Sequence, residues 1–311
     1  MSVSNQRSRF QWCQSLRWFV LALAILAAPG LAHAGGAVKV SAEDGSQTLW
    51  VIGADGDIYH YCQQCISPTW VKENFPYQPV IDMAVAGSYV YALAWNMGNG
   101  YLLFRRPTSG GGWDWETFYN TTNGVKIYGT LVTAHYDDVV IVQPSGLAYR
   151  WVPSGSTGYW SNLQNIAAYD ITTTTYPYGG YPLEGNVYFV SSGGTGYRWN
   201  GNGTGFTVYP RPTNPTAVLK SLVAPNADAT TVHALDTLGY LRVWVPTYSR
   251  WDVWTTASRI RDFVVEQWSN VPTVISDSYT CSGGGYAVAR YVPTSSGYVR
   301  TPVGPNNGCV Y

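Results

Sequence analysis

The sequence predicts an all-β fold: a β-propeller of about six four-stranded blades, preceded by a cleaved signal peptide. Three observations lead to this prediction. Short apolar stretches recur along the chain, beginning at residues 49, 90, 139, 187, 232 and 272. A glycine-bearing turn and an aromatic stretch follow each one, and no segment after the leader has sustained helical periodicity. Spacings of 41, 49, 48, 45 and 40 residues between these starts are typical of four-stranded propeller blades.

Residues 1–34 have the composition of a secretory leader. Arg7, Arg9 and Arg17 precede an apolar run that ends at the small-residue sequence "AHA" (32–34). This order of charged, apolar and small residues is that of a cleaved signal peptide, with an uncleaved anchor as the alternative. We therefore expect a single propeller domain over residues 35–311, with no membrane span after cleavage. The expected location is secreted, or periplasmic in a Gram-negative bacterium.

Each repeat unit reads as a lead strand, an apolar strand, an aromatic strand and a last strand. In the first unit these are "AVKVSA" (37–42), "LWVIGA" (49–54), "DIYHY" (57–61) and "WVKEN" (70–74). The later lead strands are "VIDMAVAG" (80–87), "VKIYGTLVTA" (125–134), "YDITTTTY" (169–176), "VLKSLVA" (218–224) and "RDFVVE" (261–266). Five or seven blades also fit, because the stretch 172–182, rich in Thr, Tyr and Gly, hides its strand boundaries.

The aromatic strands carry the candidate binding residues. Tyr149 and Trp151 share one face of their strand, and Arg150 lies between them. Such rings either fill the wedge between blades or stack on a sugar, and the neighbouring arginine either covers a ring or meets sugar hydroxyls. The predicted ligand-binding residues are Tyr61, Arg150, Trp151, Arg198, Trp199, Trp244, Arg290 and Tyr291.

Four cysteines remain after the leader is removed, and in an exported chain they predict two disulfides. Cys62 and Cys65 flank a two-residue turn, while Cys281 and Cys309 lie near the C-terminus. We expect the pairs Cys62–Cys65 and Cys281–Cys309. The alternative joins the first turn to Cys309 and closes the ring.

Composition argues against several classes of function. Without the leader, 15 basic and 18 acidic side chains give a net charge of −3, and no basic stripe indicates a nucleic-acid partner. No nucleophile motif is found, and His60, His135 and His233 lack the spacing of metal ligands. We therefore expect no cofactor, no metal and no catalytic residue, although a propeller can assemble an active site from distant blades.

The segment "LWVIGADGDIYHY" (49–61) resembles the tectonin-type repeat, and the later units keep its order of strand, glycine turn and aromatic strand. They lack the regular tryptophan ahead of each lead strand that the family has. The resemblance implies a propeller lectin that binds simple glycans between adjacent blades.

The function predicted from these features is that of a secreted, calcium-independent carbohydrate-binding propeller with repeated weak sites. The alternative is a non-catalytic propeller scaffold that binds protein in an extracellular or envelope assembly. An exposed apolar patch on one rim would favour that alternative. A third possibility is a glycan-active hydrolase or lyase, which requires converging carboxylates.

Overall fold

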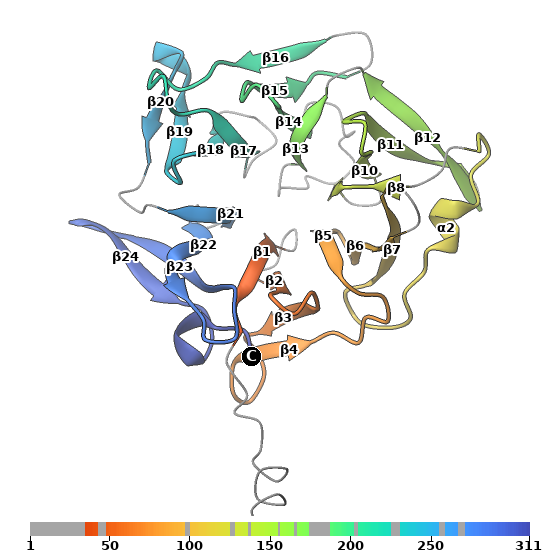
Figure 1. Ribbon diagram of the computed structural model, residues 1–311, viewed down its shortest axis with the longest axis horizontal. Helices are drawn as coiled ribbons and strands as arrows, with labels where there is room; N and C mark the ends of the chain where they lie inside the picture. Colours follow the sequence, from red (N-terminus) through yellow and green to blue (C-terminus); the bar gives the residue numbers. More distant parts are fainter. Residues whose placement is uncertain are drawn as a thin grey trace, which may run out of the picture. The chain divides into compact units, whose positions relative to one another are not determined.

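Successive quartets of antiparallel strands are arranged around a common centre (Figure 1). The computed structural model describes residues 35–42, 48–96, 100–124, 128–135, 138–154, 156–164, 167–173, 187–201, 205–224, 231–254, 259–266 and 271–311. The predicted signal peptide and most of the stretch 172–182 lie outside the described residues. The described residues belong to one compact unit, Ala34–Tyr311.

The strands confirm the predicted all-β propeller class and follow the predicted stretches closely. They are β1 (Ala37–Ala42), β2 (Leu49–Gly53), β3 (Ile58–Cys62), β4 (Thr69–Lys72), β5 (Val80–Ala86), β6 (Tyr89–Asn96), β7 (Tyr101–Pro107), β8 (Tyr128–Gly129), β9 (Leu131–His135), β10 (Asp138–Val142), β11 (Ala148–Ser154), β12 (Thr157–Gln164), β13 (Ala168–Thr173), β14 (Val187–Ser191), β15 (Gly196–Trp199), β16 (Phe206–Tyr209), β17 (Leu219–Val223), β18 (His233–Asp236), β19 (Leu241–Val245), β20 (Arg250–Val253), β21 (Ile260–Glu266), β22 (Val271–Thr280), β23 (Tyr286–Thr294) and β24 (Gly297–Pro302). Short helical turns are α2 (Glu116–Tyr119), η1 (Pro246–Tyr248) and η2 (Asn306–Gly308).

The number of separate sheets differs from the six separate blades that the sequence predicts. The quartets β5–β8, β9–β12, β13–β16 and β17–β20 each form a four-stranded sheet. The quartets β1–β4 and β21–β24 instead belong to one eight-stranded sheet. In the strand register, Ala37 and Tyr286 pair and join them where the two ends of the described chain meet.

The repeated glycine of the sequence links neighbouring quartets. In the turn between β2 and β3, Gly56 has φ +81°, and its carbonyl oxygen accepts a hydrogen bond (3.1 Å) from the N–H of Val80, the first residue of β5. Equivalent bonds run from Ala168 to Gly146, Leu219 to Gly194, Ile260 to Gly239 and Gly36 to Gly284. All five glycines have φ between +74° and +87°, a region that other residues avoid. The turn therefore connects two strands of its own quartet and also forms a hydrogen bond to the lead strand of the neighbouring quartet.

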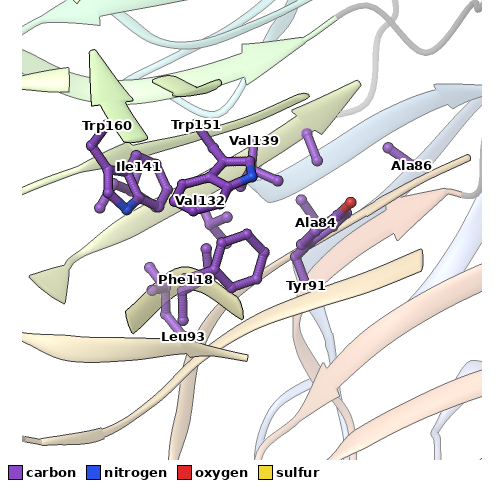
Figure 2. Packing of buried hydrophobic residues seen from close by; sticks show 12 residues of the cluster. Ala84, Ala86, Tyr91, Leu93, Phe118, Val132, Val139, Ile141, Trp151 and Trp160 are labelled. Atoms are coloured by element: carbon purple, nitrogen blue, oxygen red, sulfur yellow. The ribbon is translucent and has the colours of Figure 1, made fainter. Parts of the chain in front are cut away.

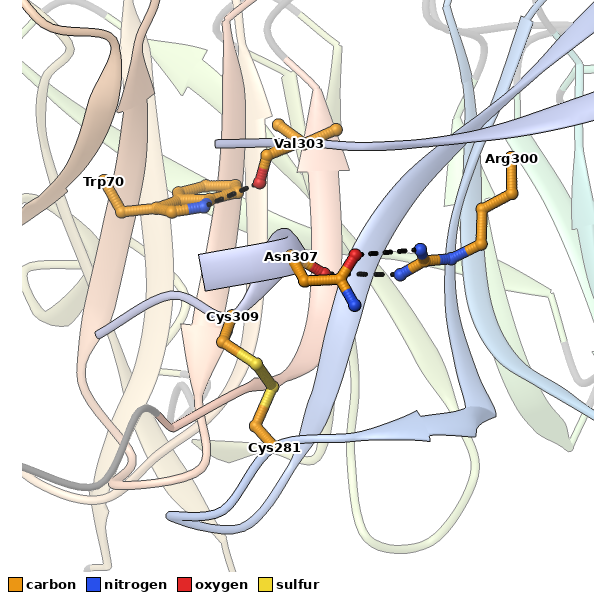
Figure 3. Close-up of a disulfide and its surroundings, with 6 residues drawn as sticks. All are labelled: Trp70, Cys281, Arg300, Val303, Asn307 and Cys309. Carbon is orange, nitrogen blue, oxygen red and sulfur yellow. Dashed lines mark hydrogen bonds between the residues drawn. A yellow bond between two sulfur atoms is a disulfide. The ribbon is translucent and has the colours of Figure 1, made fainter. Parts of the chain in front are cut away.

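The C-terminal segment fastens the last quartet to the first. Cys281 and Cys309 form a disulfide (Figure 3). The indole N–H of Trp70 in β4 donates a hydrogen bond (3.3 Å) to the carbonyl oxygen of Val303, the residue that follows β24 (Figure 3). The ring of Tyr311 stacks on Tyr59 at 5.4 Å between centroids. This segment therefore packs against blade residues from the other end of the chain.

Both expected disulfides are confirmed: Cys62–Cys65 within the turn between β3 and β4, and Cys281–Cys309. The alternative, a covalent bond between the first turn and Cys309, is wrong. The Cys281–Cys309 bond contributes to ring closure indirectly, because it holds the C-terminal segment that packs on β3 and β4.

Aromatic rings fill the spaces between quartets. Between β5–β8 and β9–β12, Phe118 of α2 lies 5.4 Å from the ring of Trp151, and Trp151 lies 5.4 Å from its cross-strand partner Trp160 (Figure 2). Leu93 and Val139 complete the same buried cluster. The wedge that widens away from the centre is thus occupied by the largest side chains.

Candidate functional site

The innermost strands enclose a narrow channel lined by polar and apolar side chains. The described residues that line its cavity of about 80 Å³ all belong to β1, β5, β9, β13, β17 and β21. Figure 1 shows β1, β5, β13, β17 and β21 facing this centre. Each of these strands is the lead strand of its quartet, so one ring of equivalent positions forms the channel wall.

A larger cavity of about 490 Å³ lies at one end of the channel and shares the lining residues Lys39, Asp170, Ser221 and Asp262 with it. We call this end the turn face, because it carries the turns 53–57, 143–147, 191–195, 236–240 and 281–285. The mouth is lined by the first residues of β1, β13, β17 and β21 and by residues of the 143–147 turn. Residues distant in sequence therefore meet there.

Charged side chains brace the wall just inside the mouth. The ammonium of Lys39 pairs with Asp82, whose second carboxylate oxygen accepts from the N–H of Val132 at 2.6 Å. Asp262 likewise accepts from the N–H of Val40 at 2.8 Å. In each case a carboxylate of one lead strand holds the backbone of the next lead strand.

A repeated β-bulge aims these polar residues. A register shift immediately precedes the inward polar residue in five lead strands, and these residues are Lys39, Asp82, Asp170, Ser221 and Asp262. A bulge locally bends a strand and re-aims the following side chain. Every second lead strand contributes an aspartate in this way.

The electrostatics of the mouth are mixed. Desolvation raises the pKa of Asp170 to about 7, and the carboxylates of Asp262 and Asp82 add to the rise while Lys39 and Lys220 oppose it. Burial also raises the pKa of Asp262. Burial alone would lower the pKa of Lys39, but the facing carboxylates outweigh it and raise that pKa. The ammonium of Lys220 donates to the carbonyl oxygen of Arg261 at 2.5 Å. The mouth thus contains both lysine ammonium groups, which donate hydrogen bonds, and aspartate carboxyl groups, which accept them.

Large apolar side chains are exposed on the same face. Tyr169, next to Asp170, has 60% of its surface exposed. Val38 and Trp95 are exposed at the turn-face ends of β1 and β6, and Leu238 and Tyr240 in the turn between β18 and β19. These side chains lie in several quartets of one face, and an exposed apolar patch on one rim is the feature expected of a protein-binding scaffold.

Two of the predicted stacking residues lie in the core. Trp151 is 3% exposed and Trp199 is 0% exposed, so neither presents a ring face to a ligand. Both fill the wedge between quartets, and the prediction that they form binding platforms is corrected accordingly. Arg150 pairs with Asp138 of the adjacent strand at 3.1 Å.

The remaining predicted residues are half-buried and are spread over four strands, β3, β15, β19 and β23. Tyr61 packs against Trp70 at 5.3 Å between centroids, and Trp244 packs against Trp251 at 5.2 Å. Tyr291 lies on β23, where burial raises its pKa. Arg198 on β15 and Arg290 on β23 are also half-buried. The structure does not bring the eight predicted residues into one site.

The described ranges contain neither a candidate metal-ion site nor a candidate membrane-spanning helix. Within them, no group of three or more His, Cys, Asp or Glu side chains has an arrangement that could hold a metal ion. The helices of the described part of the chain are too short or too polar to cross a membrane.

No protein-family model and no curated protein matches the chain. Solved structures that are similar share the fold. The extracellular domain of a one-component system from B. thetaiotaomicron aligns with 12% identity and a TM-score of 0.52, covering 87% of this chain and 33% of that one. The chain therefore spans about a third of the length of that extracellular domain.

Two further similar structures are of YCF48. The protein from Cyanidioschyzon merolae aligns with 16% identity and a TM-score of 0.52, covering 90% of this chain and 88% of that one. YCF48 bound to D1 peptide aligns with 12% identity and a TM-score of 0.50, covering 84% and 80%. At these identities the likeness shows the propeller fold alone.

Sequence reasoning did not identify Lys39, Asp170 or Lys220 as parts of one site. They lie in lead strands far apart along the chain, and only the closed ring brings them together. One signal was present: "VIDMAV", "YDITTT" and "RDFVVE" place an aspartate at the same position of every second lead strand.

Proposed function

We propose that the protein is a non-catalytic, six-bladed propeller scaffold that binds a segment of a partner protein at the channel mouth. Six blades result when each half of the eight-stranded sheet is counted as one blade. The observation that carries the proposal is the combination, on one face, of a cavity of about 490 Å³ with exposed large apolar side chains. Exposed apolar patches rimmed by polar groups are typical of interaction surfaces.

The chemistry of the mouth suits a peptide. Lys220 and Asp170 supply donors and acceptors for main-chain amides, and Tyr169 supplies an exposed ring for an apolar side chain. The similar structure of YCF48 bound to D1 peptide supports a scaffold of this kind as a peptide-binding one.

The proposed location is outside the cytoplasm. Two disulfides fit an oxidising compartment, and the similar extracellular domain agrees with that location. The N-terminal sequence features that predict export support the same proposal.

A library of displayed random peptides tests this function. We expect the folded, oxidised protein to enrich a peptide family that binds the double variant Tyr169→Ala/Lys220→Ala at least about tenfold more weakly. Tyr248→Ala is the matched control, because this exposed ring lies in η1 at the other end of its quartet. Failure of the folded protein to enrich any sequence, or equal binding by the double variant, would contradict the proposal.

Carbohydrate binding is the second candidate. It is supported by the tectonin-type resemblance of residues 49–61 and by the partial exposure of Tyr61, Trp244 and Tyr291 on three aromatic strands. A glycan array with the triple alanine variant tests it: selective binding that the variant loses supports it, and a blank array with folded protein counts against it.

A further inference from the structure

Trp95 has an unusual backbone conformation for its size. Its φ is +59°, in the left-handed region that costs a bulky residue of order 1–3 kcal/mol. It is the extra residue of a β-bulge, because Ala94 pairs with Leu102 and Asn96 with Tyr101. The side chain is nevertheless 45% exposed. Burial of the indole therefore does not explain why the backbone of Trp95 adopts this strained conformation.

The blade itself does not require an aromatic ring here. The register with the lead strands aligns Leu93 with Ile52, Val190, Leu235 and Ile275 of four other quartets. The residues two positions later, equivalent to Trp95, are Ala54, Ser192, Thr237 and Asp277. All are small or polar. Trp95 is thus a local addition to the repeat.

A column of rings holds Trp95 in place. Its ring stacks on Tyr77 at 5.8 Å with 19° between the planes, and Tyr77 stacks on Phe104 at 4.4 Å with 25°. Phe75 meets Phe104 edge-on at 5.7 Å. The column runs from the buried Phe104 to the exposed indole, so the platform loses little conformational freedom when a ligand binds.

Among the described residues, the polar side chains beside Tyr77 and in the turn 55–57 are already paired. Gln78, next to Tyr77, donates to Asp57, and Lys72 forms an ion pair with Asp57. The oxygens of Asp55 accept from the hydroxyl of Tyr59 at 2.7 Å and the N–H of Asp57 at 3.2 Å. A sugar would need free partners for several hydroxyls. A prolyl residue has no N–H and presents an apolar ring, so it fits a platform whose described polar neighbours are already paired.

We infer that Trp95, supported by Tyr77, is the docking platform for an extended, proline-containing segment of the partner protein. Such segments hold a preformed polyproline conformation, dock against exposed aromatic rings and offer carbonyl oxygens to donors such as an indole N–H. This inference rests on the proposed protein-binding function and specifies the partner's chemistry at a second point on the turn face.

The test uses a fluorescent ten-proline peptide, with a glycine–serine peptide of equal length as the negative probe. We expect the folded protein to bind the proline peptide and Trp95→Gly to bind it at least about tenfold more weakly. Glycine accepts φ +59° without strain, so the melting temperature of Trp95→Gly should stay within about 2 °C of the parent or rise. Tyr248→Ala, which removes an exposed ring elsewhere, should bind like the parent.

Three results would overturn the inference. They are no binding of the proline peptide by the folded protein, equal binding by Trp95→Gly, and Trp95-dependent binding of β1,4-linked glucose or N-acetylglucosamine hexasaccharides in place of the peptide. The mouth variant Tyr169→Ala/Lys220→Ala does not change Trp95, so a failure of this inference can be distinguished from a failure of the proposed function. Library peptides that still require Tyr169 and Lys220 would leave the mouth proposal standing.

Discussion

Gly194 lies where the quartets β13–β16 and β17–β20 contact each other, and this contact leaves no room for a side chain. A Cβ added to Gly194 would lie 2.4 Å from the Cβ of Val218, at a residue whose φ is +74°. The carbonyl oxygen of the same glycine accepts the hydrogen bond from Leu219 that joins the two quartets. The steric and backbone requirements therefore coincide at one residue.

We expect Gly194→Ala to lower the free energy of unfolding by about 2–4 kcal/mol. Gly205 is the matched control, since its φ is +79° and a Cβ there would meet nothing within 4 Å. Gly205→Ala should cost only about 1 kcal/mol, from the positive φ alone. Urea denaturation measures both, and equal losses would show that the clash between blades has no energetic consequence.

The carboxyl group of Asp170 links stability to pH. Its pKa of about 7 in the folded protein lies above the value of about 4 in an unfolded chain. Between these values the folded state binds more protons, so the free energy of unfolding falls as pH rises from about 4 to about 7 and stays lower above that.

Asp170→Asn keeps a neutral side chain at every pH. We expect the variant to exceed the parent in the free energy of unfolding by about 1–3 kcal/mol at pH 8 and to match it near pH 4. Thermal denaturation at the two pH values is the measurement. A variant that is less stable than the parent at pH 8 would show that the charged form of Asp170 stabilises the mouth.

At the scale of elements, a buried ionic network joins the first two quartets. Glu73, which follows β4, forms an ion pair with Arg106 of β7 and a 2.5 Å hydrogen bond with the Nδ1 atom of His60 on β3. Glu73 and Arg106 are both buried. Removing one partner leaves a buried charge without compensation, which costs more than replacing both partners.

Glu73→Leu alone should therefore lower the free energy of unfolding by about 3–5 kcal/mol. The double variant Glu73→Leu/Arg106→Met should recover most of that loss, because no uncompensated charge remains. A double-mutant cycle in urea measures the coupling, and a double variant as unstable as Glu73→Leu would contradict this view of the network.

The strand pattern was the most predictable level of structure. Period-two alternation and glycine turns located the strands, because a blade buries both faces and turns sharply between strands. The division between packing and binding aromatics was less predictable. Trp151 and Trp244 occupy similar strands, yet only the arrangement of neighbouring quartets determines that the first is buried and the second half-exposed.

At the scale of the whole molecule, the channel mouth lay beyond sequence reasoning. Lys39, Asp170 and Lys220 approach each other only after every quartet is in place, and no local motif encodes that distance. The two disulfide pairs were predictable, because each lies within one repeat unit. The role of Cys309 in ring closure was not, because it depends on where the C-terminal segment packs.

The two disulfides should contribute unequally. The Cys281–Cys309 bond has a sequence separation of 28 and holds the segment that packs on Trp70 and Tyr59, whereas Cys62–Cys65 has a separation of 3. From loop closure we expect roughly 3–4 kcal/mol for the longer loop and about 2 kcal/mol for the shorter one. The double serine variants, compared by thermal denaturation, test this order. A larger loss from Cys62→Ser/Cys65→Ser would refute the closure role of the C-terminal segment.

The hydrogen bond between Gly36 and Gly284 joins residues that the ribosome makes about 250 positions apart, a delay of roughly 12–50 s at about 5–20 residues per second. During that interval the first blade has a neighbour on one side only, and its other apolar face awaits a partner not yet made. The nascent chain thus carries an unsatisfied surface until translation is almost complete.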